Sequence, residues 1–259
     1  DFLLSLVGSE MCIRDSSWPT QNAAPGSTVR SGDKVGNPAT AIYKDAIRGA
    51  VKGGREYDEE QASAWTAYAD KSCSSCPATW RQVWYDDPDS FSAKIGYALD
   101  QGLAGVGMWA PGMDGAREEM WWALRNQLQP RLDEDPPNGS PALDPETVEG
   151  DIDGQDVIRG SASLRLFAAD DVDGSGLALV RIGLDGELDE EGRLTTARSY
   201  PAVERIDFPL ADPETGGSAA EGPRSIHVQW RDLAGNWSIP VVIEAHVLAP
   251  KTTAVPADL

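Results

Sequence analysis

The chain is poor in basic residues, in cysteine and in long apolar runs. Its 22 Lys and Arg face 42 Asp and Glu, which gives a formal net charge of −20 at neutral pH. A surface of that sign opposes sequence-independent binding to nucleic acid, because phosphate contacts rely on clustered Lys and Arg. The apolar stretches are all shorter than the roughly 18 residues of a spanning helix, so we expect no membrane span.

The remaining composition is that of a globular protein. The 259 residues are 41% hydrophobic and include 9 Trp, which supplies enough apolar surface for the core of one or two domains. The two histidines, His227 and His246, fall within strand patterns in the second half of the chain, far from Cys73 and Cys76. These residues form no ligand set at metal-binding spacing, so we expect neither a metal ion nor a cofactor.

The first sixteen residues are interpreted as translated sequencing adapter. Their apolar run, Phe2–Val7, is shorter than the roughly 7–15 residues of a secretory signal core, and no basic segment precedes it. The codons that can specify residues 10–16 resemble the transposase end sequence used in library preparation. A truncated leader is the alternative. On the adapter interpretation the protein's own sequence begins near Ser17, and Cys12 drops out of the cysteine count.

Helix and strand patterns alternate between residues 17 and 128. Asp87 and Pro88 predict the start of a helix, since Asp caps free backbone N–H groups and Pro suits the first helical position. The run 103–110 is apolar on both alternate sets of positions, as in a parallel strand that is buried on both faces. The alternation predicts a parallel α/β structure. The expected helices are 40–52, 87–101 and 114–128, and the expected strands are 62–68, 81–85 and 103–110.

The second half of the chain has a different pattern. The segment 129–147 is Pro-rich and acidic, which is typical of an interdomain linker. Short strand patterns separated by Gly, Asp and Pro turns then predict an all-β sandwich at 148–250, followed by a tail at 251–259. The segment Trp230–Ser238 resembles a hairpin of bacterial immunoglobulin-like domains, which supports this fold. The expected strands are 163–167, 177–182, 205–208, 225–230 and 241–247.

Residues 80–128 resemble the end of the catalytic barrel in glycoside hydrolase family 18, the group of chitinases and spore-coat peptidoglycan hydrolases. The resemblance rests on the W-Y-D-D segment at 84–87, which leads into a helix, and on the segment GLAGVGMW at 102–109. Trp18-Pro19-Thr20 also looks like the segment after the sixth strand of that barrel. The resemblance thus covers about residues 17–128, less than half of a (β/α)₈ barrel of about 250 residues. It implies a partial barrel followed by the immunoglobulin-like sandwich.

The resemblance also implies a set of sugar-binding residues. Trp109 matches the tryptophan that forms the floor of the central sugar subsite, where a flat apolar ring suits stacking on a pyranose. Tyr85 and Asp86 end a strand and are expected to line the cleft, and Trp18 is expected at an adjacent subsite. The alternatives are a core tryptophan at 109, a turn residue at 86 and a loop-packing tryptophan at 18.

The catalytic acid of the family has no counterpart in this sequence. Its D-x-x-D-x-D-x-E signature supplies the acid of a substrate-assisted, retaining mechanism, and no Asp triplet with that spacing occurs here. The resemblance implies a secreted or cell-surface bacterial parent enzyme that hydrolyses β-1,4-linked N-acetylglucosamine polymers, either chitin or peptidoglycan. We expect this chain to be inactive by itself. The alternative is a non-catalytic carbohydrate-binding or cell-surface scaffold protein.

Two further motifs remain. Cys73 and Cys76 lie in a loop between two predicted strands, and a loop disulfide of an exported protein is favoured over two free thiols. A redox C-x-x-C would instead open a helix of a thioredoxin-like unit. The segment Asp171–Gly176 begins like a calcium loop but has Ile182 where the acidic ligand would stand, so a β-turn is favoured.

Overall fold

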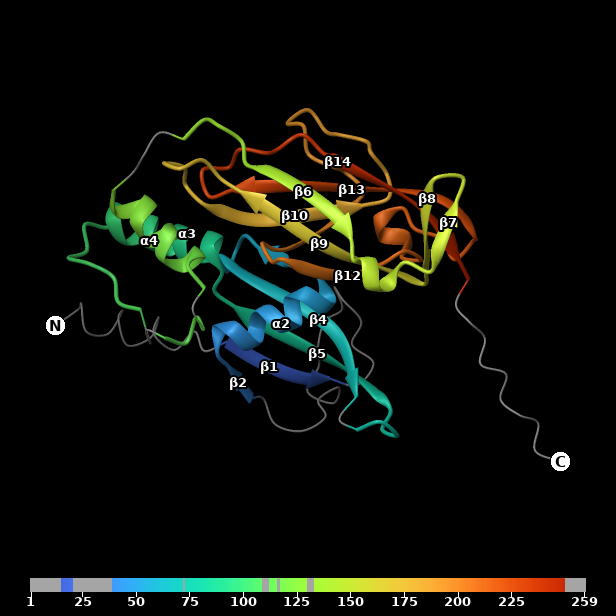
Figure 1. The fold of residues 1–259 in the computed structure, drawn as a ribbon. Helices are drawn as coiled ribbons and strands as arrows, with labels where there is room; N and C mark the ends of the chain where they lie inside the picture. The colour runs from blue at the N-terminus through green and yellow to red at the C-terminus, as the bar shows by residue number, and fades with distance from the viewer. Residues whose placement is uncertain are drawn as a thin grey trace.

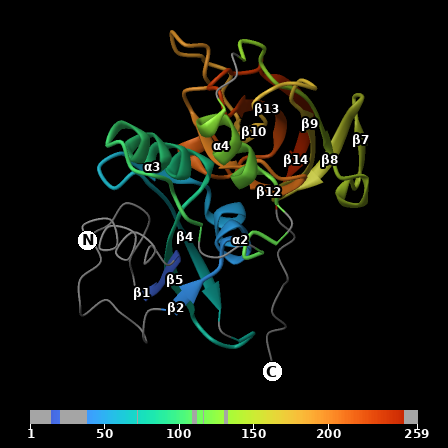
Figure 2. The ribbon, with the colours of Figure 1, turned by 90° about the vertical axis from the view of Figure 1, so that its left-hand side faces the viewer.

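In the computed structural model, the described residues are 15–20, 39–71, 73–108, 112–115, 117–129 and 133–249. They form two β-rich parts. The first is an open sheet with three helices, and the second is a two-sheet sandwich. One of the three helices lies between the two parts (Figures 1 and 2). No helix within these residues is long and apolar enough to cross a membrane.

The first part is a five-stranded sheet in the order β2-β1-β5-β4-β3. Each of its pairings is antiparallel. Helix α2 packs on one face of this sheet, over β4 and β5. The strands are β1 (Asp15–Thr20), β2 (Ala39–Ala41), β3 (Glu56–Asp58), β4 (Ser63–Lys71) and β5 (Ala78–Tyr85), and the helices are α2 (Tyr43–Gly53), α3 (Pro88–Asp100) and α4 (Glu119–Leu128).

The expected parallel arrangement is therefore wrong for the strands that the structure describes. Strands β4 and β5 are joined by the six residues 72–77, and a connection that short joins antiparallel neighbours, whereas parallel strands need a crossover of a dozen or more residues. Residues 103–108 of the expected strand 103–110 have no regular structure, and Val106 is 40% exposed. A strand that is apolar on both faces needs a partner strand and a covering layer, and no described strand pairs with 103–108.

The helices follow the sequence more closely. Asp87 caps α3 as predicted, because its Oδ1 accepts a hydrogen bond from the backbone N–H of Ser90 at 2.9 Å, and Pro88 takes the first helical position. Helix α4 begins at Glu119 instead of near Asp114. The Asp114 carboxylate accepts a hydrogen bond from the indole Nε1 of Trp121 at 2.8 Å and does not cap the helix.

The second part consists of two sheets that pack over a common core. One sheet has the order β11-β10-β13-β14-β8-β7 and the other β12-β9-β6, and the pairing of β14 with β8 is parallel. The predicted all-β character is confirmed. The strands are β6 (Asn138–Leu143), β7 (Gly150–Ile152), β8 (Gln155–Arg159), β9 (Ser161–Ala169), β10 (Leu177–Gly183), β11 (Ala197–Pro201), β12 (Arg205–Pro209), β13 (Gly222–Asp232) and β14 (Val241–Leu248).

The segment expected as a linker, 129–147, differs from that expectation in its second half. Residues 138–143 form β6, which pairs with β9 at the edge of the three-stranded sheet. An edge strand tolerates Pro141, because one side of its backbone makes no ladder hydrogen bonds. Leu143 is 6% exposed and belongs to the sandwich core, so burial at a single apolar position holds the strand. The Pro-rich composition of the segment gave no indication of this position.

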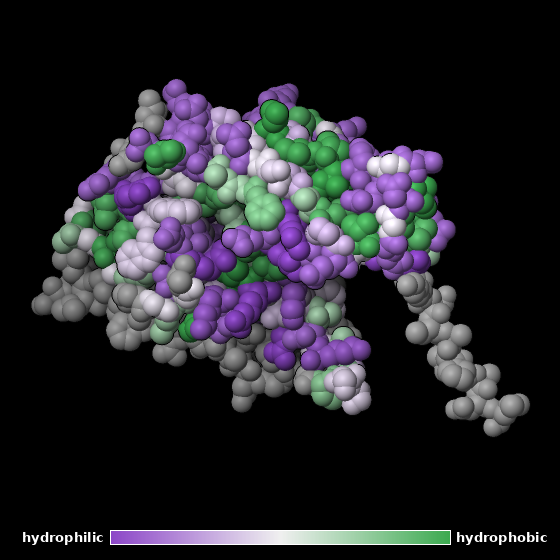
Figure 3. Space-filling model, viewed as in Figure 1, coloured by the Kyte–Doolittle hydropathy of each residue, from purple (hydrophilic) through white to green (hydrophobic). Residues whose placement is uncertain are grey.

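Helix α2 joins the two parts. It packs against β4 and β5 on one side and against β11 and β12 on the other. Val51 of α2 and Val203 of the sandwich contact both apolar cores. Figure 3 shows hydrophobic residues in the indentation between the two parts, flanked by hydrophilic ones.

An ion-pair network closes the same junction. Asp89 of α3 accepts hydrogen bonds from Arg55 at 2.8 Å and from Arg231 of β13 at 2.6 Å, and Arg55 also pairs with Asp87 at 2.8 Å. Burial lowers the pKa of the Arg55 guanidinium, but Asp87 and Asp89 outweigh that effect and raise it. The two arginines come from different parts of the molecule, so the Asp89 carboxylate links them.

Replacing Asp89 by Ala tests this link. The substitution leaves two partly buried guanidinium groups without their shared acceptor, and we expect it to lower the free energy of unfolding by about 1–3 kcal/mol. Urea unfolding followed by tryptophan fluorescence measures the change. The control is Asp100→Ala at the exposed end of the same helix, which we expect to change stability by less than about 0.5 kcal/mol. Equal stability of the two variants would show that the network contributes nothing.

Candidate functional site

Tyr85 ends β5 and lies inside the core. Its side chain is 0% exposed, and its ring centroid is 6.5 Å from that of Tyr43 on α2. Strand alternation explains this position, because Val83 and Tyr85 face α2 while their neighbours face the other side of the sheet. The expectation that Tyr85 lines a cleft is therefore wrong for this structure.

Asp86 is separate from the helix cap. Asp87 takes the capping role, and Asp86 forms an ion pair with Lys94, on the second turn of α3. Both side chains of this pair are about a quarter exposed, at 25% for Asp86 and 23% for Lys94. The Asp86 carboxylate therefore lies partly exposed just after the end of β5, and its expected place in the cleft stays a prediction.

The structure describes the two tryptophans predicted to bind sugar to different extents. Trp18 lies in β1, where its backbone is opposite Gln82 of β5. Its side chain lies outside the described part of the structure, as does the whole of Trp109. The structure thus brings the backbone of Trp18 next to the strand that ends at Tyr85 and Asp86, and the role of Trp109 rests on sequence.

Three other tryptophans share the sheet face opposite α2. Trp65 of β4 and Trp84 of β5 are directly opposite in the register, and their rings stack with centroids 5.8 Å apart and planes 22° apart. Trp80 follows on the same face of β5, four residues before Trp84, with Gln82 between them. All three indoles are partly exposed. We call Trp65, Trp80 and Trp84 the tryptophan face.

Sequence reasoning missed the tryptophan face. The signal was the W-x-x-x-W spacing of Trp80 and Trp84, which places both side chains on one face of a strand. The strand itself was predicted to begin at residue 81, so Trp80 lay outside it. The position of Trp65 opposite Trp84 depends on the hairpin register, which the loop sequence alone does not specify.

An acidic cluster lies at one end of the sandwich. Carboxylate oxygens of Asp133, Asp170 and Asp232 lie within 4.8 Å of one another. The Asp232 carboxylate is buried and accepts hydrogen bonds from the backbone N–H groups of Gly235 and Asn236 at 2.7 and 2.8 Å, so it shapes the predicted hairpin. Burial raises the pKa of Asp232, although these hydrogen bonds lower it.

The neighbouring segment 171–174 forms a turn. The backbone N–H of Gly174 donates to the carbonyl of Asp171 at 3.0 Å, which confirms the β-turn that was favoured over a calcium loop. Burial raises the pKa of Asp171, and the carboxylates of Asp135, Asp170 and Asp133 add to that shift. The cluster supports the turn and the hairpin, and we assign no metal ion to it.

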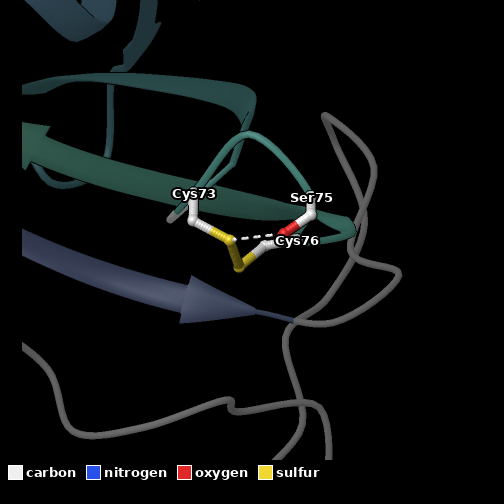
Figure 4. Close-up of a disulfide and its surroundings, with 3 residues drawn as sticks. All are labelled: Cys73, Ser75 and Cys76. Carbon is white, nitrogen blue, oxygen red and sulfur yellow. Dashed lines mark hydrogen bonds between the residues drawn. A yellow bond between two sulfur atoms is a disulfide. The ribbon is translucent and has the colours of Figure 1, made fainter.

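The predicted disulfide is present. Cys73 and Cys76 are bonded at the tip of the hairpin formed by β4 and β5 (Figure 4).

Comparison with known proteins identifies a chitinase-like region. The chain matches no protein-family model. It is 36% identical over 100 residues to di-N-acetylchitobiase from Mus musculus, an alignment that covers 35% of this chain and 25% of that protein. Di-N-acetylchitobiase from Rattus norvegicus is 34% identical over 84 residues, covering 29% of this chain and 22% of its own length. The chain thus spans about a quarter of the curated relatives that it matches.

Structural similarity to solved chitinases is weak. The chitinase ChiW from Paenibacillus sp. overlaps 90% of this chain and 26% of its own, with 14% sequence identity and a TM-score of 0.38. Overlap at this level defines no common fold. The chitinase-like region therefore rests on sequence similarity.

Replacing Asp171 by Asn tests the electrostatics of the acidic cluster. A carboxyl whose folded pKa is raised destabilises the folded state once it ionises, so its penalty is absent below the ordinary pKa and present at neutral pH. We expect the variant to melt about 1–2 °C above the parent at pH 7 and together with it at pH 3. Differential scanning calorimetry at both pH values measures this. Asp207→Asn, on an exposed strand position, is the control, and the same gain in it would contradict the assignment.

Proposed function

We propose that the chain is part of a chitinase-family glycoside hydrolase whose substrate is a β-1,4-linked N-acetylglucosamine polymer, chitin or peptidoglycan. The similarity to di-N-acetylchitobiases carries the assignment to this class of enzyme. The W-Y-D-D segment at 84–87 and the segment at 102–109 support it. The disulfide is consistent with a secreted or cell-surface protein, since such bonds persist in oxidising compartments.

The tryptophan face is the surface that we propose contacts the polymer. The stacked indoles of Trp65 and Trp84 form a flat apolar area, and sugar rings present a flat apolar face of their own. Gln82 lies between Trp80 and Trp84 and offers an amide to sugar hydroxyls. Asp86 at the strand end and Trp109 complete the proposed contacts, and Trp109 has this role from the family resemblance.

Hydrolysis needs a group that this chain does not supply. A glycosidic oxygen must be protonated as it leaves, and the signature that carries the acid in the resembling family is missing from the 259 residues. The parent enzyme is proposed to supply that acid from outside this chain. The immunoglobulin-like assignment of the sandwich belongs to the same proposal and rests on the Trp230–Ser238 hairpin.

The proposal predicts that the chain by itself does not hydrolyse the substrate. The purified chain is expected to release no chromophore from a chromogenic chitobioside above the buffer rate, because the signature that carries the general acid is missing from its sequence. An absorbance assay run overnight, with a commercial chitinase as positive control, measures this. Turnover that persists through further purification would contradict the absence of an acid.

The proposal also predicts that the tryptophan face binds chitin. Replacing Trp65 and Trp84 together by Ala is expected to weaken retention on chitin beads about tenfold, since each stacking contact contributes about 0.5–1.5 kcal/mol. A pull-down titrated with bead mass measures the apparent affinity. The control is Trp121→Ala, which removes a 43% exposed indole from α4. Equal loss in both variants, or no loss in the double variant, would remove the tryptophan face from the proposal.

A non-catalytic carbohydrate-binding or cell-surface scaffold is the second candidate, favoured by the missing acid. Reading an unbroken long DNA molecule through the locus separates the two. A D-x-x-D-x-D-x-E strand in frame before Ser17 supports the glycosidase. A complete barrel in which that Glu is replaced supports the scaffold. A genomic origin for residues 1–16 would overturn the adapter interpretation.

A further inference from the structure

The disulfide lies at an exposed hairpin tip. Cys73 and Cys76 stand within the six residues between Lys71, the end of β4, and Ala78, the start of β5. Cys73 is exposed and Cys76 is partly exposed. The last buried residues of the two strands before the tip are Ala67 and Val83, so the bond is several positions away from the core.

The bond constrains little of the unfolded chain. It joins residues three positions apart, and the entropy that a cross-link removes from the unfolded state grows with the logarithm of the loop that it closes. The bond closes a ring of only four residues, so the entropy that it removes from the unfolded state is near the small end of that range. The disulfide therefore contributes much less stability than a bond between distant segments would.

The hairpin is also held without the bond. Lys71 and Ala78 pair directly at the base of the tip, and eight consecutive residue pairs join β4 to β5. Within the tip, the backbone N–H of Cys76 donates to the carbonyl of Cys73 at 3.1 Å. The ladder and this turn hydrogen bond do not involve the sulfur atoms, so we expect the surrounding fold to stay intact when the disulfide is reduced.

We infer that Cys73–Cys76 is a thiol–disulfide exchange site for low-molecular-weight thiols. Disulfides that add little stability and are open to solvent are the ones that exchange with external thiols. A thiolate attacks Sγ of Cys73, the more exposed of the two residues; the Cys73–Cys76 bond breaks, a mixed disulfide forms on Cys73, and Cys76 leaves as a thiolate. A second thiolate then attacks the external sulfur of the mixed disulfide and releases Cys73. The two external thiols end as one disulfide, and the two cysteines are reduced.

The local structure limits this site to accepting and releasing small thiols. Catalytic C-x-x-C pairs have a thiol whose pKa is lowered by a helix N-terminus, whereas this pair sits in a turn between two strands. Ser75 Oγ lies 3.4 Å from Cys73 Sγ and is a neutral neighbour. The chain is therefore a target of thiol modification and is not itself a disulfide oxidoreductase.

The test compares the rate of reduction in the folded and the unfolded chain. Cys12 is first alkylated without reductant, dithiothreitol is added, and newly freed thiols are trapped with a second alkylating reagent and measured by peptide mass spectrometry. We expect the rate constant in the folded chain to be within about threefold of that in denaturing urea. A folded chain that is reduced a hundredfold more slowly would overturn the inference.

Two further measurements separate an exchange site from a structural bond. The double variant Cys73→Ser/Cys76→Ser is expected to melt within about 2 °C of the parent, like the control Ser74→Ala/Ser75→Ala, which keeps the bond. A much larger fall in the cysteine variant alone would show a structural bond. Glutathione added to the folded parent, with the freed thiol trapped by alkylation, is expected on Cys73, as located by fragment-ion sequencing of the peptide that contains both cysteines. An adduct confined to Cys76 would overturn the proposed direction of attack.

Discussion

The two-sided burial of helix α2 is the constraint on which the rest of the structure depends. One side of α2 lies so close to β4 that a Cβ atom at Gly53 would be 2.3 Å from the carbonyl oxygen of Ala67, and one at Gly49 would be 2.7 Å from the Tyr68 ring. The other side meets β11 and β12 of the sandwich. Because one helix fills both interfaces, the sheet that carries the tryptophan face and the sandwich are packed against each other.

The position of α2 also determines which aromatic residues of β5 are buried and which lie on the opposite face. The face that α2 covers takes Val83 and Tyr85 into the core, and the opposite face carries Trp80 and Trp84. A residue that resembles a binding position in sequence can thus be structural, while its neighbour one position earlier is available for contact. The chemistry proposed for the chain follows from that alternation, since stacking needs an indole at a surface.

Much of the local structure could be predicted from the sequence. The start of α3 followed from Asp87 and Pro88, because a capping carboxylate and a fixed proline φ act within four residues. Short-range signals also predicted the loop disulfide and five of the nine described sandwich strands, β9, β10, β12, β13 and β14, but not β6, β7, β8 or β11. The sequence signals failed where the presence or absence of a partner strand decided whether a segment forms a strand. Residues 103–108 have a strand-like apolar pattern without a described partner, and β6 is a strand despite its Pro-rich composition.

The sequence by itself determined the composition class, the all-β second half, the helix cap, the resemblance of 80–128 to a glycosidase barrel and the missing acid. The tertiary structure decided that the described strands of the first part pair antiparallel, that Tyr85 is buried, and that Asp89 holds Arg55 and Arg231 together. The division has a physical reason. Caps, turns and periodicity depend on neighbours in the chain, whereas register, burial and ion pairs between distant segments depend on how the layers pack.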